Sequence, residues 1–453
     1  MTSLFGTDGI RGVANADPLI PETAVRIGLA IADQCRKKAP KPMVVIGRDT
    51  RRSGGMLEGA LASGISSAGL EVLSAGVVPT PAVAHLVKVL GTAAGVVISA
   101  SHNPFGDNGI KVFDHTGRKL SREVERQIEQ RLADTADATA ERRPQGAAVG
   151  SIRRLEDAVA RYSAFIGEAL MPQTRFQGLR LVVDCANGAM SRIAPGLLAK
   201  LGADVTALGT RPDGVNINAG CGSEFPDSLA GEVVRLKADA GLAFDGDGDR
   251  LVAVTAQGHV LTGDQVLAIL ANHLLASGQM TSPWVVSTVM SNMGLSQALD
   301  KMGLHHAVTQ VGDRNVMEKM LAVGARLGGE NSGHTILADH HSTGDGLLTA
   351  LKLLEAMVTA DSSMAALSRV MTVYPQVLEA VTVPFKPDLE TLPDVQRAIR
   401  DAETQLAGKG RVLVRYSGTQ PVCRVMVEAE SQDAAESICR DLSQVIAQSI
   451  QDS

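Results

Sequence analysis

The chain has 453 residues, of which 45% are hydrophobic and only 3% aromatic. That length is enough for three or four domains of roughly 100 to 200 residues each, and the excess of aliphatic over aromatic side chains favours helices packed on buried strands. The formal net charge of -6 argues against bulk binding to nucleic acid or to an acidic membrane, because both need a basic face. Any anionic ligand must therefore be held by local cations.

The cysteines and the apolar stretches indicate where the protein works. The five cysteines are odd in number and include no C-x-x-C pair, so neither a disulfide framework nor a zinc site is indicated. The residues that follow Met1 lack the basic start and apolar core of a signal peptide, and no apolar run approaches the roughly 18 residues of a membrane span. We therefore expect a soluble protein of a reducing compartment, the cytoplasm.

Three similar stretches follow one another along the chain. Each contains an apolar strand, a helical stretch, a second strand opened by glycine, and a third strand that runs into a polar loop. The first strands are expected at residues 43–46, 181–183 and 284–286, and the polar loops at residues 99–109, 245–250 and 328–334. Strands that alternate with helices predict mostly parallel sheets, whose ligand sites lie beyond the carboxyl ends of the strands. All three loops lie at such ends.

Changes in composition divide the chain further. Residues 133–150 lack periodicity, which is typical of a solvated connection, and a helix with apolar residues at helical spacing is expected over residues 155–169. After residue 372, short strands and two helices indicate a smaller α+β domain. The predicted fold is α/β, with three related mixed-sheet α/β domains and a C-terminal α+β domain, over residues 1–150, 151–254, 255–370 and 371–453.

The first polar loop belongs to the stretch GVVISASHNPFGDNGIKVF, residues 95–113. A buried strand ending at Ile98 delivers Ser101 and His102 into a loop punctuated by proline and glycine. Ser101 is therefore expected to be exposed at a strand end, a position that suits a nucleophile or a phosphate carrier because the strand fixes the hydroxyl. An ordinary turn serine is the alternative.

The second loop, DGDGDR, is the most specific chemical signal. Asp245, Asp247 and Asp249 are separated only by glycines, so their carboxylates can converge on one hard cation. A calcium loop of the EF-hand type is rejected, because Arg250 stands where that loop needs glycine and Ala256 where it needs glutamate. With three protein carboxylates and further ligands from water or phosphate, the site suits Mg²⁺. A solvated acidic turn is the alternative, but three like charges so close repel one another.

Two further loops carry groups that bind sugars and phosphates. Residues 328–334, GGENSGH, offer a carboxylate, an amide, a hydroxyl and an imidazole that can bind sugar hydroxyls; for His334 alone a surface role competes with catalysis. Residues 415–421, RYSGTQP, followed by Arg424, offer two hydroxyls, backbone N–H groups and two arginines, which is how a dianionic phosphate is gripped. A plain β-turn is the alternative there. For FGTDGIRG (residues 5–12) and GRDTR (residues 47–51), a structural turn or ion pair competes with substrate contact.

The four loops together resemble those of the α-D-phosphohexomutases, through SASHNP, DGDGDR, GENSGH and R-x-SGT. The resemblance covers essentially the whole chain. Within that family, FGTDGIRG, SHNPFGDNGIKVF and GVNINAGCGS (residues 214–223) are most similar to the bacterial branch that acts on glucosamine phosphates. The resemblance implies four domains around a central active-site cleft, each contributing one loop.

The family's activity is implied with it. Phosphorylated Ser101 would phosphorylate glucosamine 6-phosphate to a sugar 1,6-bisphosphate, which turns over in the cleft and returns its other phosphoryl group, giving glucosamine 1-phosphate for amino-sugar nucleotide and cell-wall precursor synthesis. The implied cofactor is one Mg²⁺ held by three aspartates and a serine-phosphate oxygen: Asp245, Asp247, Asp249 and Ser101. The implied partner is a phosphosugar, with a homodimer left open.

The resemblance also implies roles for single residues. Lys111 is a candidate general base and His334 a second proton-transfer group, whereas charge near Ser101 would be neutralised by Arg11, His102 and Arg250. Sugar hydroxyls would be held by Glu330 and Ser332. The phosphate that does not react would be held by Arg415, Ser417, Gly418, Thr419 and Arg424.

Two departures from the family pattern and three rival functions stay open. Gln420 replaces the usual glutamate of the phosphate loop, and Tyr416 replaces a common small or basic residue. Phosphate binding is still expected, because the matching hydroxyls and arginines remain. The rival functions are a phosphomannomutase or phosphoglucomutase, a sugar-phosphate sensor without catalysis, and a Mg²⁺-dependent phosphatase in which water intercepts the phosphoserine.

Overall fold

The computed structural model describes residues 4–6, 8–36, 42–133, 143–417 and 421–451. The chain forms two compact units, which are described separately: residues 1–290 with 304–370, and residues 291–303 with 371–453. Within the described ranges, every helix is too short or too polar to cross a bilayer.

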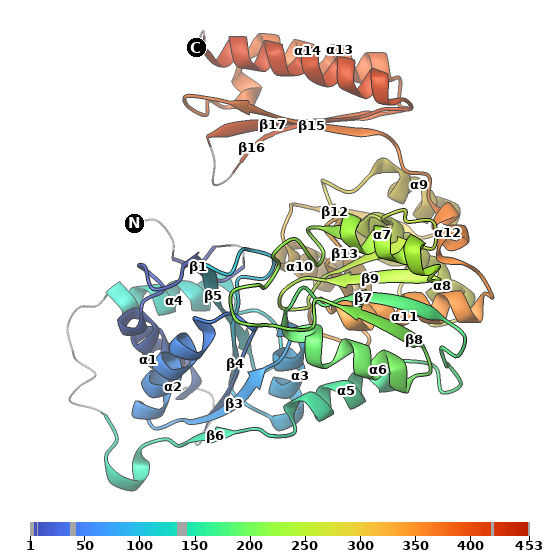
Figure 1. The fold of residues 1–453 in the computed structure, drawn as a ribbon. Helices are drawn as coiled ribbons and strands as arrows, with labels where there is room; N and C mark the ends of the chain where they lie inside the picture. The colour runs from blue at the N-terminus through green and yellow to red at the C-terminus, as the bar shows by residue number, and fades with distance from the viewer. Residues whose placement is uncertain (1–3, 7, 37–41, 134–142, 418–420, 452–453) are drawn as a thin grey trace. The chain divides into compact units, whose positions relative to one another are not determined.

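The first sheet has six strands in the order β1-β5-β4-β2-β3-β6 (Figure 1). Their bounds are Ile10–Val13 (β1), Met43–Arg48 (β2), Glu71–Val77 (β3), Ala94–Ile98 (β4), Asp107–Asp114 (β5) and Ile152–Arg154 (β6). Strands β2, β3, β4 and β6 are parallel, whereas β5 runs antiparallel to β4 and β1 antiparallel to β5. Every residue of β4 is buried, as expected for the central strand that leads to the serine loop.

Four helices belong to this sheet: α1 (Pro21–Arg36), α2 (Gly54–Ser67), α3 (Thr80–Leu90) and α4 (Arg122–Ala133). Helices α1 and α2 pack closely because Gly28 and Gly64 face the partner backbone. A Cβ atom on Gly28 would lie 2.5 Å from the carbonyl oxygen of Leu61, and one on Gly64 would lie 2.2 Å from that of Val25. Isoleucines and leucines of both helices fill the core against β2 and β4.

The next two sheets repeat one arrangement. Their strands are β7 (Arg180–Asp184), β8 (Asp204–Leu208), β9 (Ala240–Phe244) and β10 (Leu251–Thr255), then β11 (Trp284–Thr288), β12 (His305–Thr309), β13 (Leu327–Gly329) and β14 (Thr335–Leu337). The orders β10-β9-β7-β8 and β12-β11-β13-β14 match β5-β4-β2-β3 of the first sheet, and the fourth strand is always antiparallel to the third. This confirms the prediction of three related α/β domains with mixed sheets. Each polar loop joins the third strand of its sheet to the fourth.

The helices around these sheets are α5 (Ala158–Glu168), α6 (Ala194–Lys200), α7 (Pro226–Leu236), α8 (Gly263–Ala276), α10 (Asp313–Val323), α11 (Gly346–Thr359) and α12 (Met364–Leu367). Short 3₁₀ turns span Gly146–Ala148, Ala189–Arg192 and Ser368–Val370. Helix α8 begins at a capping box in which the Thr262 side chain accepts from Gln265 N and the Gln265 side chain bonds back. Helices α8 and α11 are buried on nearly all sides, which explains their continuous apolar sequences.

The helix expected over residues 155–169 begins three residues late, at Ala158. The preceding residues, Ile152–Arg154, form β6 and pair with β3, so the first sheet extends past residue 150. All three β6 side chains are exposed, so the sequence lacks the alternation of apolar and polar residues that would predict this strand.

The second unit contains one antiparallel sheet in the order β15-β17-β16. Its strands are β15 (Gln376–Thr382), β16 (Arg411–Tyr416) and β17 (Val422–Glu428), and its helices are α9 (Met293–Lys301), α13 (Pro393–Leu406) and α14 (Gln432–Gln451), with a 3₁₀ turn at Leu389–Thr391. Figure 1 shows α13 and α14 side by side on one face of this sheet, where their apolar residues form its core. The smaller C-terminal α+β domain is thereby confirmed. Buried Glu428 binds α9 by accepting from Met293 N, 3.0 Å away.

In the first unit, three segments distant in sequence meet at His341. Its Nε2 atom lies 3.0 Å from the carbonyl oxygen of Pro81, and its ring meets that of Phe165 edge-on, with 5.2 Å between the ring centres. The ring of Phe165 in turn stacks on His85 at 4.0 Å. Burial lowers the pKa of His341 to about 3. The imidazole is therefore neutral and donates to Pro81.

Acid is expected to destabilise the fold through His341. Below its unfolded pKa of about 6.5 the unfolded chain binds a proton that the folded chain does not, so stability falls as the pH drops from about 6.5 towards 3. By pH 5 this single group should cost about 2 kcal/mol. His341→Gln keeps a donor without titrating, so its urea midpoint should fall less between pH 7 and pH 5 than that of the wild type. Parallel losses in both proteins would contradict this assignment.

Candidate active site

Ser101 lies at the turn that follows β4, with a positive φ of 54°. The prediction that Ser101 is exposed is wrong, because only 1% of its surface is accessible. The aspartate loop packs against it: the Ser101 hydroxyl donates to Asp245 Oδ2 at 2.5 Å, and its backbone N–H donates to Ser99 Oγ at 2.9 Å. The serine and the acidic loop, 144 residues apart, thus form one site.

The conformation of the serine loop is fixed by buried Arg51. Its guanidinium donates to the carbonyl oxygens of Ser101 at 3.0 Å and Asn103 at 2.8 Å, and bonds further to the carbonyls of Pro104 and Asp107. Asp49 pairs with Arg51 at 2.8 Å and accepts from the hydroxyl of Ser99 at 2.6 Å. For these two residues of GRDTR the structure therefore supports a structural role, but the expected ion pair between units is instead a pair within one loop.

The three aspartates lie together under the serine. One carboxylate oxygen from each lies within 4.8 Å of the others, and all three side chains are buried. Among the described residues, the Oδ1 atoms of Asp247 and Asp249 have no hydrogen-bond partner. Buried unpaired carboxylate oxygens are costly, so the cluster fits a hard cation with oxygen ligands, as Mg²⁺ requires.

The pKa values of two acids in the cluster are shifted in opposite directions. Burial, followed by the charges of Asp249 and Asp247, raises the pKa of Asp245 well above its ordinary value. Burial also acts to raise the pKa of Asp247, but Lys111 and a hydrogen bond from Thr80 at 2.6 Å outweigh it and lower that pKa. A bound cation would act in the opposite direction, because a nearby positive charge favours the ionised form of a carboxyl group.

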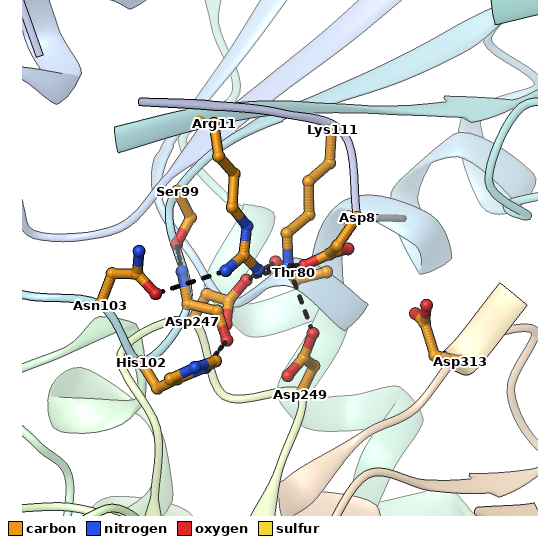
Figure 2. Close-up of polar contacts among 12 residues, drawn as sticks. Asp8, Arg11, Thr80, Ser99, His102, Asn103, Lys111, Asp247, Asp249 and Asp313 are labelled. Atoms are coloured by element: carbon orange, nitrogen blue, oxygen red, sulfur yellow. Dashed lines mark hydrogen bonds and ion pairs between the residues drawn. The ribbon is translucent and has the colours of Figure 1, made fainter. Parts of the chain in front are cut away.

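Lys111 extends from β5 into the same cluster (Figure 2). Its Nζ atom lies 2.8 Å from Asp247 Oδ2, 3.4 Å from Asp249 Oδ2 and 3.0 Å from Asp8 Oδ2. Burial would lower the pKa of Lys111, but these three carboxylates raise it well above the ordinary value. Without a cation in the cluster Lys111 is an ammonium ion, so its predicted role as general base requires the carboxylates to be neutralised first.

A cavity of about 630 Å³ opens beside the cluster, within the first unit. It collects side chains from the N-terminal loop and from all three polar loops, and of the predicted site residues it is lined by Arg11, His102, Asp249, Arg250, Glu330, Ser332 and His334. The sequence resemblance had assigned these to catalysis, metal binding or substrate binding. Their roles stay predictions, but the fold brings them to one cavity.

The cations near Ser101 are held by neighbours in the cavity. Arg11 pairs with Asp8 and reaches Asn103 Oδ1 at 3.5 Å (Figure 2), while Arg250 lies 3.7 Å from Glu224. Burial, followed by the charge of Arg250, lowers the pKa of His102, whose Nδ1 lies 3.4 Å from Ser101 Oγ. This shift favours the neutral form of His102, so its predicted cationic role requires an anionic group nearby.

The third polar loop, within residues 328–334, joins β13 to β14. Glu330 Oε1 accepts from the backbone N–H of Gly312 at 2.9 Å, which leaves its second oxygen for a ligand. His334 is 3% exposed, and within the described chain neither ring nitrogen has a hydrogen-bond partner. A buried polar atom without a partner requires an explanation, and contact with a bound ligand is one.

The predicted phosphate grip lies in the second unit, on β16 and β17. Arg415 and Arg424 are directly opposite each other in the sheet, and burial together with Arg424 lowers the pKa of Arg415. Like charges so placed repel, which an anion between them would relieve. Ser417 is buried, and its carbonyl oxygen accepts from Lys386 at 2.6 Å. Gly418 and Thr419, like Gln420, lie outside the described residues.

Several residues that support the site were not predicted. Asn218 donates to the carbonyl oxygens of Ser101 at 2.9 Å and Asn103 at 3.0 Å, and Thr80 bonds to Asp247. Asn218 lies within GVNINAGCGS, a motif matched to the family without a role. Nothing local in the sequence distinguishes Thr80, because its partner is 167 residues away.

Four family models match successive parts of the chain. They describe the α/β/α domains I, II and III of phosphoglucomutase/phosphomannomutase, at residues 2–139, 160–258 and 262–374, and the C-terminal domain, at residues 378–445. The chain belongs to the phosphoglucomutase/phosphomannomutase family. Each of the four matched segments contains most of the strands of one of the four sheets.

Curated relatives match over nearly their full length. A protein of Syntrophus aciditrophicus (strain SB) named phosphoglucosamine mutase is 46% identical over 99% of this chain and 100% of its own. Another of that name, from Desulforapulum autotrophicum, is 49% identical over 99% of each chain. These identities confirm the phosphohexomutase family predicted from the four loops.

Solved structures of the family share the fold. A phosphoglucomutase/phosphomannomutase family protein from Burkholderia thailandensis superposes with a TM-score of 0.81 at 26% identity, over 99% of this chain and 98% of its own. A protein of Thermus thermophilus described as a putative phosphomannomutase gives 0.78 at 24% identity, over 98% of each chain. The second likeness, at that identity, concerns the fold alone.

Proposed function

We propose that this family member is an isomerase that interconverts glucosamine 6-phosphate and glucosamine 1-phosphate, with Ser101 as the phosphoryl carrier. The observation that carries the mechanism is the 2.5 Å hydrogen bond from the Ser101 hydroxyl to Asp245, inside a cluster of three carboxylates. The substrate follows from the relatives named phosphoglucosamine mutase, which are 44–49% identical to this chain.

The chain's own residues supply positioning and charge. Arg51 and Asn218 hold the backbone of Ser101, so the residue is positioned before the hydroxyl exchanges its hydrogen bond to Asp245 for a phosphoryl group. Asp245, Asp247 and Asp249 would hold Mg²⁺, which neutralises charge on the transferring group. Arg11 and Arg250 add positive charge on the cavity side.

Proton transfer is proposed to involve Lys111 and His334. His334 lines the cavity and can accept a proton from a sugar hydroxyl. Lys111 is buried at the carboxylate cluster and would act as a base only once a cation has neutralised those carboxylates. Glu330 and Ser332 are proposed to hold sugar hydroxyls, and the arginines of β16 and β17 the second phosphate. The bisphosphate intermediate can then bind in either orientation.

Comparative turnover tests the substrate. The purified protein, with Mg²⁺ and a trace of glucose 1,6-bisphosphate, should isomerise glucosamine 1-phosphate at least tenfold faster than mannose 1-phosphate or glucose 1-phosphate, judged by kcat/KM. Equal or faster turnover of mannose 1-phosphate would replace this substrate with that of a phosphomannomutase. Steady release of inorganic phosphate without isomerised sugar would support a phosphatase instead, and tight binding without turnover would support a sensor.

The cellular setting is also proposed. The reaction would supply an amino-sugar 1-phosphate for nucleotide-sugar and cell-wall precursor synthesis, which occurs in the cytoplasm. The free cysteines suit that compartment: burial raises the pKa of Cys423 and Cys439 to about 11, so their thiols are protonated. The homodimer stays open to measurement.

A further inference from the structure

A chain of alternating charges runs from Lys111 to His334 through residues to which no role has been given. Lys111 pairs with Asp8 at 3.0 Å, Asp8 pairs with Lys119, and Lys119 pairs with Asp313. Asp313 Oδ2 then lies 3.7 Å from His334 Nε2. The three intermediate side chains are 11–22% exposed, so the chain is largely shielded from water.

Asp313 is placed to keep its charge. It is the first residue of α10, where the helix dipole favours a carboxylate. Burial would raise the pKa of Asp313, but Lys119 outweighs burial and lowers it. Asp313 is thus a stable anion on one side of the His334 ring.

The His334 ring cannot turn away freely. Gly344 lies against it so closely that a Cβ atom there would come within 2.2 Å of Nε2 and 2.4 Å of Cε1. On the backbone side, His334 bridges to Arg250 of the aspartate loop. The ring is therefore held in a slot with Nε2 on the side of Asp313.

We propose that Asp313, charge-balanced by Lys119, is a positioning residue that fixes the proton of His334 on Nε2 and leaves Nδ1 as the basic nitrogen for substrate. At 3.7 Å from Nε2 the Asp313 carboxylate makes no hydrogen bond, but its negative charge favours the proton on the nearer ring nitrogen. The same charge stabilises the imidazolium that forms when the other nitrogen takes a proton. This inference rests on the proposed function for its role in turnover. The tautomer itself does not depend on that function.

Kinetics of a double-mutant cycle test whether Asp313 acts through His334. Asp313→Asn should lower kcat for glucosamine phosphate by roughly 10- to 100-fold, the range seen when the partner that orients a metal-bound histidine is removed, with KM within about twofold of the wild type. In a His334→Gln background the same change should cost almost nothing, because the two effects share one cause. Glu318→Gln, an exposed neutralisation on the same helix, is the matched control.

Loss of the same size in both backgrounds, or no loss in either, would overturn the proposal. A second measurement needs no activity. In protein labelled with ¹⁵N-histidine, the His334 signals, assigned by their absence in His334→Gln, should show the Nε2–H tautomer, and Asp313→Ala should mix the two tautomers. An Nδ1–H tautomer in the wild type would refute the proposal even if the variants fail to fold.

If the wild type lacks glucosamine phosphate turnover, the proposed function fails, while the tautomer of His334 still decides this inference.

Discussion

Ser101→Ala is expected to abolish isomerisation of glucosamine phosphate, by at least about 10⁴-fold in kcat. The hydroxyl is the atom that would carry the phosphoryl group, and no neighbouring serine occupies the same place: Ser99 Oγ is already bonded to Asp49 and to the Ser101 N–H. Alanine also removes the donor to Asp245. Initial rates with excess glucose 1,6-bisphosphate measure the loss.

Intact mass gives a readout that does not depend on turnover. Wild-type protein incubated with glucose 1,6-bisphosphate should gain the mass of one phosphoryl group, which peptide mapping should place on Ser101, and Ser101→Ala should gain none. Ser342→Ala, a serine that bonds to Gly117 away from the cluster, should behave as the wild type. Retained activity in Ser101→Ala, or a phosphoryl group on another residue, would overturn the mechanism.

Asp245→Asn is expected to remove both activity and the response to magnesium. Three carboxylates within 4.8 Å repel one another, by about 4 kcal/mol for a pair of full charges 4 Å apart at an effective dielectric constant of 20. Mg²⁺ relieves that repulsion in the wild type, so 100 times its Kd should stabilise the fold by about 2.7 kcal/mol. The variant should gain far less, and its kcat should fall by about 10³-fold or more.

Thermal unfolding with and without MgCl₂ measures the stabilisation separately from catalysis. Without metal, Asp245→Asn should be at least as stable as the wild type, because it removes a carboxyl group whose pKa burial and like charges have raised. Asp204→Asn, an exposed residue at the start of β8, is the control and should keep the full increase in stability with MgCl₂. An equal shift in Asp245→Asn would place the cation elsewhere.

The elements were predictable because their signals are local. Apolar runs predicted β4 and β9, and glycines predicted the turns, so the three repeated units and the smaller C-terminal domain were confirmed. Strand β6 was missed for the opposite reason: its three side chains are exposed and its stability comes from backbone pairing with β3.

Those residues of the candidate site that belong to short, recognisable motifs could be predicted from the sequence. Ser101, the three aspartates, Glu330 and His334 could be named from their loops, and the common position of those loops between third and fourth strands explains why they meet. The burial of Ser101 could not be predicted, because it depends on a loop 144 residues away.

By itself, the sequence predicted which side chains would carry the chemistry of this protein, and it determined at the ends of which strands they lie. Only the tertiary structure decided their environment: Arg51 beneath Ser101, Lys111 held as an ammonium by three acids, and Asp313 beside His334. The physical reason is that charge state and orientation depend on burial and on partners distant in sequence. Arg51 is 50 residues from Ser101, and Lys111 is 136 residues from Asp247, so the local sequence pattern cannot predict either contact.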